Sequence, residues 1–246
     1  MENKLVPSYK NMSKPTNAYK KQFAIVLQIY RRDKDAIDLF GIERGFLLLL
    51  AASLLIQPVT FVRWISGYGG YLTRKLAIEV YALAKPFLLL GILLGGYWYY
   101  SISLFIAGLC LMDLYVYLLG LIFLSDFYSG PASFKRSLIL LFVNLFESVC
   151  EFAVLYLGTQ SIGTNLVATT SWSQAIYFST VTAATVGYGD VSAISGIGRL
   201  LVVFQIFTSV VFASVILSSY VGQLFSGGWK KDRNEKKSTR RGEQRI

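Results

Sequence analysis

The sequence predicts an all-α integral membrane protein. Of its 246 residues, 54% are hydrophobic and 15% are aromatic, which is too apolar for an ordinary water-soluble domain of this size. Several apolar runs are long enough to cross a bilayer as helices, and basic residues gather in short stretches beside these runs and at the ends of the chain. We therefore expect a compact multi-pass protein of the cell membrane.

The charge balance and the cysteines exclude several classes of function. A formal charge of +10 is compatible with nucleic-acid binding, but the basic residues flank apolar runs as the cytoplasmic ends of membrane segments do. The expected partner is membrane lipid, anionic lipid included, and not nucleic acid. Cys110 and Cys150 lie inside apolar runs, so their spacing predicts neither a metal site nor a disulfide. Because the chain has no histidine and no nucleophile paired with a base, we expect neither an enzyme nor a cofactor.

The first 45 residues are polar and basic and predict a cytoplasmic segment. Within them Phe23, Val26, Leu27 and Tyr30 recur at helical spacing, which predicts a helix lying on the inner leaflet. A floppy tail is the alternative.

A short apolar segment and a helical hairpin follow. Residues 46–62 are apolar but are interrupted at Pro58, which favours an interfacial or re-entrant segment over a full span. Residues 76–96, kinked at Pro86, and residues 102–124 predict two spans joined by a tight aromatic turn. With two later spans at 137–157 and 198–225 the sequence favours four spans, and a fully spanning segment 46–62 would make five. Four spans keep the basic N-terminus on the cytoplasmic side, in agreement with the positive-inside rule.

The most informative stretch is Thr185-Val186-Gly187-Tyr188-Gly189-Asp190, which lies between a short aromatic helix and a long apolar helix. Backbone carbonyl groups that replace the water shell of a cation need torsions that suit glycine, as at Gly187 and Gly189. A second Gly-Tyr-Gly at Ser66-Gly67-Tyr68-Gly69-Gly70 has neither the Thr-Val pair nor a long apolar flank, and it predicts a glycine-rich loop.

In this setting the motif resembles the pore signature of the tetrameric potassium channels. The resemblance covers the last third of the chain and implies an outer helix, a pore helix, a selectivity filter and an inner helix. It implies that Thr185, Val186, Gly187, Tyr188 and Gly189 form the filter, with K+ as the permeant ion bound through oxygens of the first four. Because each chain supplies one filter strand, it also implies a homotetramer. A weakly selective cation channel and an accessory subunit of a heteromeric potassium channel remain alternatives.

The chain then divides into four parts. These are a basic cytoplasmic segment (1–45), N-terminal membrane helices (46–136), an ion-channel pore domain (137–225) and a basic cytoplasmic tail (226–246).

Two aromatic residues are expected to support the filter. Ser171-Trp172-Ser173-Gln174 fits a capping box that opens the pore helix. Tyr177 and Phe178 follow on that helix, where the family resemblance places bulky aromatics that pack behind Tyr188.

Further positions follow from the same resemblance. Val181 stands where some channels carry a glutamate that pairs with the aspartate after the filter, so Asp190 at the outer mouth needs another partner. On the inner helix Ser209 falls where many members place a hinge glycine. Ser209 and Ala213 are expected to line the cavity below the filter, close helix packing being the alternative.

Three acidic residues lie inside predicted spans, namely Asp113, Glu147 and Glu151. Such groups usually face protein or water, and Glu147 and Glu151 share a helix face. We expect them either to sense pH or brace the pore, or to be neutral hydrogen-bonded carboxyls at a helix contact.

Overall fold

The computed structural model describes residues 17–31, 41–124, 134–164 and 167–218, and it confirms the expected all-α membrane fold. The helices are α1 (Asn17–Arg31), α2 (Gly41–Ile56), α3 (Pro58–Ile65), α4 (Gly70–Leu94), α5 (Ser101–Phe123), α6 (Phe134–Gly158) and α7 (Trp172–Ala183), with short 3-10 turns η2 (Ser66–Gly69) and η3 (Tyr97–Tyr99). The strands are β1 (Ile162–Thr164), β2 (Val167–Ala168) and β3 (Ser192–Ala193). A last long helix, called the inner helix below, covers Gly196–Ser218 of the described residues.

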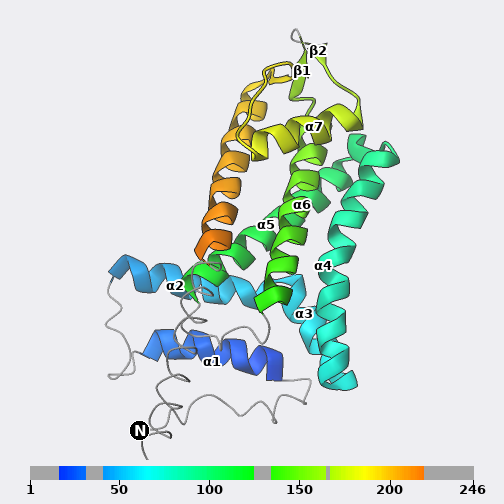
Figure 1. Ribbon diagram of the computed structural model, residues 1–246. Coiled ribbons are helices and arrows are strands. Elements are labelled where there is room, and N and C mark those ends of the chain that lie inside the picture. The colour runs from blue at the N-terminus through cyan, green and yellow to red at the C-terminus, as the bar shows by residue number, and fades with distance from the viewer. Residues whose placement is uncertain (1–16, 32–40, 125–133, 165–166, 219–246) are drawn as a thin grey trace, which may run out of the picture.

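Four of these helices are long and apolar enough to cross a membrane, namely Leu76–Leu94 of α4, α5, Ser137–Gly158 of α6 and the inner helix. α6 lies in the middle, with α4 on one side and the inner helix on the other (Figure 1). In the span of α6 56% of the residues are buried, against 17–28% in the other three, because α4, α5 and α7 all pack on it. α5 crosses the bundle obliquely and reaches the base near the inner helix (Figure 1).

The hairpin between α4 and α5 turns at a glycine and an aromatic cluster. Gly96 adopts a left-handed conformation, with φ of 73°, directly before η3. Trp98 is buried in the main core, whereas Tyr97 and Tyr100 are exposed. An exposed aromatic belt beside a buried tryptophan is typical of a helix end at a membrane interface.

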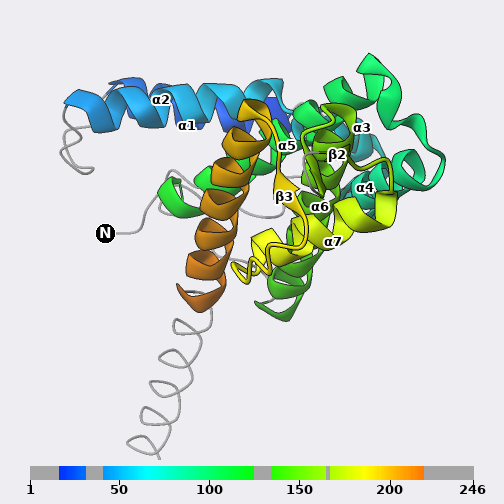
Figure 2. The same cartoon turned by 90° about the horizontal axis from the view of Figure 1, so that it is seen from above.

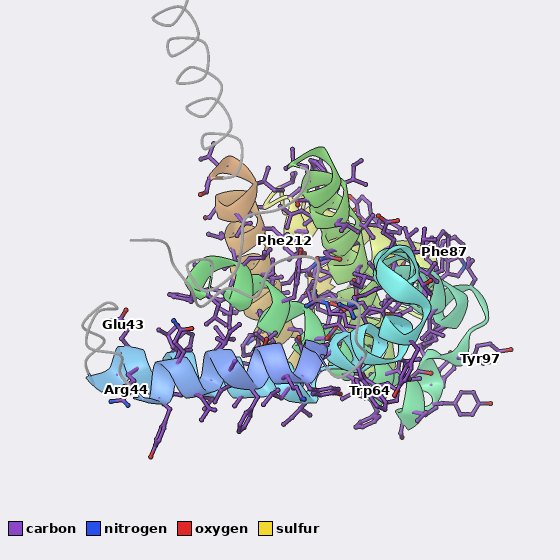
Figure 3. The ribbon with its side chains drawn as sticks, turned by 90° about the horizontal axis from the view of Figure 1, so that it is seen from below. Glu43, Arg44, Trp64, Phe87, Tyr97 and Phe212 are labelled. Atoms are coloured by element: carbon purple, nitrogen blue, oxygen red, sulfur yellow. The ribbon has the colours of Figure 1, made fainter. Side chains whose placement is uncertain are left out.

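The three N-terminal helices lie across the base of the bundle. α1 and α2 run antiparallel. The Gln22 side chain, near the start of α1, donates to the carbonyl of Ala51, near the end of α2, at 3.1 Å. Arg44, near the start of α2, bonds the carbonyl of Tyr30, near the end of α1. Figure 3 shows these helices from below, with Arg44 at one end of the layer and Trp64 of α3 further along it.

α1 packs on the protein through a face that the sequence prediction did not address. Ile25 and Ile29 are buried against α2, while Phe23 and Tyr30, expected on the membrane-facing side, are exposed. The exposed aromatics remain available for the membrane contact that the sequence predicts.

The apolar segment predicted at 46–62 forms α2 and α3, which bend by 53° at their junction. Pro58 takes the first position of α3, where its missing N–H costs no hydrogen bond. Both helices lie across the base rather than along the bundle (Figure 1), which favours four spans over five. The glycine-rich stretch that follows is not the predicted loop: it forms η2, and Gly70 begins α4.

This arrangement predicts that α1 lies on the side of the membrane opposite the small sheet. In the full-length protein, Lys20→Cys should react with a membrane-impermeant maleimide only after the cells are opened, whereas Thr164→Cys in β1 should react in intact cells. The native cysteines, which lie within spans, give the background. Labelling of Lys20→Cys from outside would establish five spans and contradict this topology.

Candidate functional site

The short helix expected before the motif is α7, which crosses the top of the bundle from the side of α4 toward the inner helix (Figures 1 and 2). Ser171 is its N-cap, with extended torsions, and its carbonyl accepts the N–H of Ala175 at 3.1 Å. The predicted capping box does not form. The Ser171 hydroxyl lies 2.8 Å from that of Ser173, and the Gln174 side chain bonds the hydroxyl of Thr169 instead.

α7 ends in a tight turn that leads directly into the motif. The N–H of Val186 donates to the carbonyl of Val181 and the N–H of Thr185 to that of Thr182, both at 3.0 Å, which is the bonding pattern of a Schellman cap. Thr185 occupies the left-handed position of this cap with φ of 56°, where glycine is usual. A non-glycine residue there costs about 1–2 kcal/mol. Strain of this kind persists only where the surrounding structure fixes the backbone, and it is common at functional sites.

Left-handed torsions then recur at every second residue of the motif. The φ angles are 56° at Thr185, 58° at Gly187 and 83° at Gly189. In an ordinary strand successive carbonyl groups point to opposite sides, and reversing the torsions at alternate residues turns them toward one side. Among the described residues, no backbone hydrogen bond ends on a carbonyl oxygen between Thr185 and Gly189. The segment therefore presents a row of free oxygen atoms.

The far end of the motif is held by the three-stranded sheet, in the order β2-β1-β3. β1 pairs with β3, and the Thr164 hydroxyl donates to the backbone carbonyl of Asp190 at 3.3 Å. The start of the inner helix approaches the same place so closely that a Cβ on Gly198 would lie 2.4 Å from the carbonyl oxygen of Ser161. Glycine is therefore required at 198. The segment from Thr185 to Gly189 is thus fixed at one end by the cap of α7 and at the other by the sheet.

Asp190 finds its partner in Tyr177. The Tyr177 hydroxyl donates a hydrogen bond to the Asp190 carboxylate, and this bond raises the pKa of Tyr177 above its ordinary value. Val181, where the resemblance would allow a glutamate, contributes only its carbonyl to the cap of α7. One of the two predicted supporting aromatics thus acts through its hydroxyl.

Phe178 takes a different place from the predicted one. It is buried, with its ring edge-on to that of Tyr156 of α6 at a centroid distance of 5.0 Å. Tyr188, behind which it was expected to pack, is 71% exposed. Within one chain Phe178 therefore belongs to the core between α6 and α7.

A buried polar network joins the three helices around the motif. The amide nitrogen of Gln205, on the inner helix, donates to the carbonyl and hydroxyl oxygens of Ser179 on α7 at 2.8 and 2.7 Å. Its amide oxygen accepts a hydrogen bond from Tyr156 of α6 at 2.8 Å. Ser179 in turn donates to the carbonyl of Val149 at 2.8 Å. In an apolar interior each of these bonds is directional, so the network fixes α7 relative to both flanking helices.

The motif and its resemblance did not point to Gln205, Ser179 or Tyr156. The signal available in the sequence was that Gln205 interrupts the apolar inner helix. In the structure its side chain is only 1% exposed. A polar side chain within a span usually has a specific partner on a neighbouring helix. The identity of that partner depended on the packing.

The predicted cavity residues lie on the lower part of the inner helix. Ala213 is exposed, and Ser209 is half-buried with its hydroxyl bonded to the carbonyl of Gln205 at 3.0 Å. Val203, Phe207 and Val210 are also exposed, whereas Thr208 and Phe212 face the rest of the chain. Figure 3 shows Phe212 directed into the bundle. One side of the inner helix is thus free for other contacts.

Comparison with known families identifies the region that holds this site. Residues 138–226 match a family model described as an ion channel. The match includes α7, the motif and the inner helix. No curated protein and no solved structure matches the chain. The chain therefore carries an ion channel domain, which indicates passage of ions through a membrane rather than catalysis.

The network predicts that Gln205→Leu lowers the stability of the fold and fixes the motif at residues 185–190 less firmly. The substitution leaves the buried Tyr156 hydroxyl without its acceptor, at about 1–3 kcal/mol for an unsatisfied group, and removes the amide donor from Ser179, whose hydroxyl keeps its bond to Val149. The midpoint temperature of thermal unfolding in detergent should fall, and discrimination between ions should change in the same variant. Ser214→Ala, which removes a hydroxyl bonded only within the inner helix, is the matched control. Unchanged unfolding in Gln205→Leu would show that the network contributes nothing.

The Tyr177 bond predicts a different result for two variants at the outer end. Tyr177→Phe removes the hydrogen bond and keeps the charge of Asp190, whereas Asp190→Asn removes the charge and keeps an acceptor. If the charge concentrates cations, Asp190→Asn should lower conductance at low salt and less at high salt, because salt screens the field. Tyr177→Phe should shorten openings equally at both salt concentrations. Identical behaviour of the two variants would contradict separate roles for charge and bond.

Proposed function

We propose that the ion channel domain conducts potassium selectively and passively across the cell membrane as a homotetramer. The observation that carries this proposal is the segment from Thr185 to Gly189, whose carbonyl oxygens are free and whose torsions alternate. Rows of carbonyl oxygens replace the hydration shell of K+ in selectivity filters. K+ would bind through the hydroxyl and carbonyl of Thr185 and the carbonyls of Val186, Gly187 and Tyr188.

Surface exposure in the single chain supports the tetramer. One strand supplies a quarter of each ion cage, so a closed ring of four copies is needed to surround an ion. Val186 and Tyr188 are exposed, as are Val203 and Phe207 of the inner helix. Exposed apolar side chains beside a polar segment are what an assembly about a central axis would cover or place along the pore.

The outer mouth favours cations. Between residues 158 and 197 Asp190 is the one charged side chain in the sequence. Four copies would form an acidic ring beside the free carbonyls, and such a ring raises the local concentration of cations. The Tyr177 hydroxyl would interact with this carboxylate.

The proposal predicts potassium over sodium permeation from the protein alone. Purified protein in planar bilayers should show a reversal potential that follows the potassium gradient, and mass measurement in detergent should give four chains. A reversal potential midway between the two ions would instead support a weakly selective cation channel. Absence of conduction by the purified chain, with conduction restored by another channel protein, would support an accessory subunit. Gly187→Ala, which a left-handed torsion disfavours, should abolish conduction and serves as the non-conducting control.

A further inference from the structure

A lysine and three carboxylates meet inside the membrane-spanning bundle. The ammonium group of Lys85, on α4, lies 2.9 Å from Oδ2 of Asp113 on α5 and 2.8 Å from Oε1 of Glu147 on α6. The Tyr81 hydroxyl also donates to Asp113, at 3.0 Å. Each of these residues lies within a span, so the contacts are shielded from bulk water.

Glu151 has no such partner. It lies one turn beyond Glu147 on α6 and is 0% exposed, and neither of its carboxylate oxygens receives a hydrogen bond from a donor group among the described residues. A fully buried carboxylate without a donor is expensive in an apolar interior. Its side chain is directed at two potential ligands, because its carboxylate lies within 4.8 Å of both the Cys110 sulfur and a carboxylate oxygen of Glu147.

The charges around Glu151 do not balance. One ammonium group, that of Lys85, faces the carboxylates of Asp113, Glu147 and Glu151. With all four groups ionised, two negative charges remain uncompensated within the bundle. Buried carboxylates in such a group are neutralised either by protons or by a bound cation. A divalent cation would offset two of the negative charges, and a thiolate ligand would add one.

We propose that Cys110, Glu147 and Glu151 bind one divalent transition-metal ion between α5 and α6. The ion would take the Cys110 sulfur, one oxygen of Glu151 and the oxygen of Glu147 that Lys85 does not contact. Lys85 then acts as an outer partner that orients Glu147, as groups around metal ligands commonly do. The spacing of the cysteines along the sequence gave no sign of this site, because its ligands come from two helices.

The ligand set selects the class of metal. Calcium and magnesium take oxygen ligands throughout, and a thiolate is a poor ligand for either ion. Zinc accepts sulfur and carboxylate ligands together in tetrahedral sites. Zinc, with cadmium as its spectroscopic substitute, is therefore the expected occupant.

A metal at this place would fasten the N-terminal hairpin to the ion channel domain. Cys110 belongs to α5, which also reaches the inner helix, where the Tyr115 hydroxyl bonds Thr208 and lies 3.2 Å from the carbonyl of Phe204. Glu147 and Glu151 belong to the outer helix α6. The proposal does not depend on ion conduction, so it can be tested whether or not the channel conducts potassium.

The test is metal binding by purified full-length protein in lipid nanodiscs. Wild-type protein dialysed against micromolar zinc should retain one zinc per chain by elemental analysis, and titration with cadmium should produce the ultraviolet sulfur-to-cadmium charge-transfer band. Cys110→Ser should lose the band and bind zinc at least about tenfold more weakly. The second cysteine offers a matched control. Cys150→Ser, which changes a buried thiol on the same helix as both glutamates, should keep the band.

Two further measurements keep the proposal falsifiable. Glu151→Gln should weaken zinc binding without removing the thiol, and circular dichroism should show whether each variant stays folded. Zinc binding should also weaken as the pH falls, because protons compete for the same ligands. No retained zinc and no cadmium band in the wild-type protein would overturn the proposal and leave protons as the neutralising charge. Equal loss of the band in Cys110→Ser and Cys150→Ser would overturn it as well.

Discussion

The backbone between Thr185 and Gly189 has to leave its carbonyl oxygens free, and the rest of the ion channel domain depends on that constraint. A segment that makes no internal backbone hydrogen bonds cannot hold its own shape. It is held from the inner end by the cap of α7, from the outer end by the bond of Thr164 to the Asp190 carbonyl, and at its outer carboxylate by Tyr177. The strained torsion of Thr185 persists because both ends are fixed.

Polar side chains within the apolar bundle stand where separate helices have to be placed accurately. Gln205 joins the inner helix to α6 and α7 near the motif at residues 185–190, and Lys85 joins α4 to α5 and α6. Lipid offers little hydrophobic driving force between helices, so packing and directional bonds decide their relative positions. The two clusters differ in one respect. The Gln205 amide is bonded at both its nitrogen and its oxygen, whereas the Glu151 carboxylate beside the Lys85 cluster has no hydrogen-bond donor among the described residues.

The N-terminal helices connect to this domain through α5. Its upper part packs with α4 and α6, and its lower part meets the inner helix through Leu114, Leu118 and Phe212. α2 packs below on the end of α5 near Leu124, and α1 packs on α2. A displacement of the basal layer would therefore reach the inner helix through α5.

Periodicity and composition determined the fold class and the long apolar helices, and the Thr-Val-Gly-Tyr-Gly-Asp motif located the candidate site, because apolar runs and short motifs are local signals. The family resemblance also implied that Asp190 lacks a glutamate partner at Val181. Tertiary packing alone decided the partner of each polar side chain. Tyr177 is the partner of Asp190, and Lys85 is the partner of Asp113 and Glu147. Gln205 bonds Ser179 and Tyr156. Packing also placed Phe178 against Tyr156, packed α1 on Ile25 and Ile29, and left Ser171 without its capping bond. Each of these outcomes depends on contacts between helices or on competing local hydrogen bonds. The sequence of one helix does not specify which side chain of a neighbouring helix will contact it.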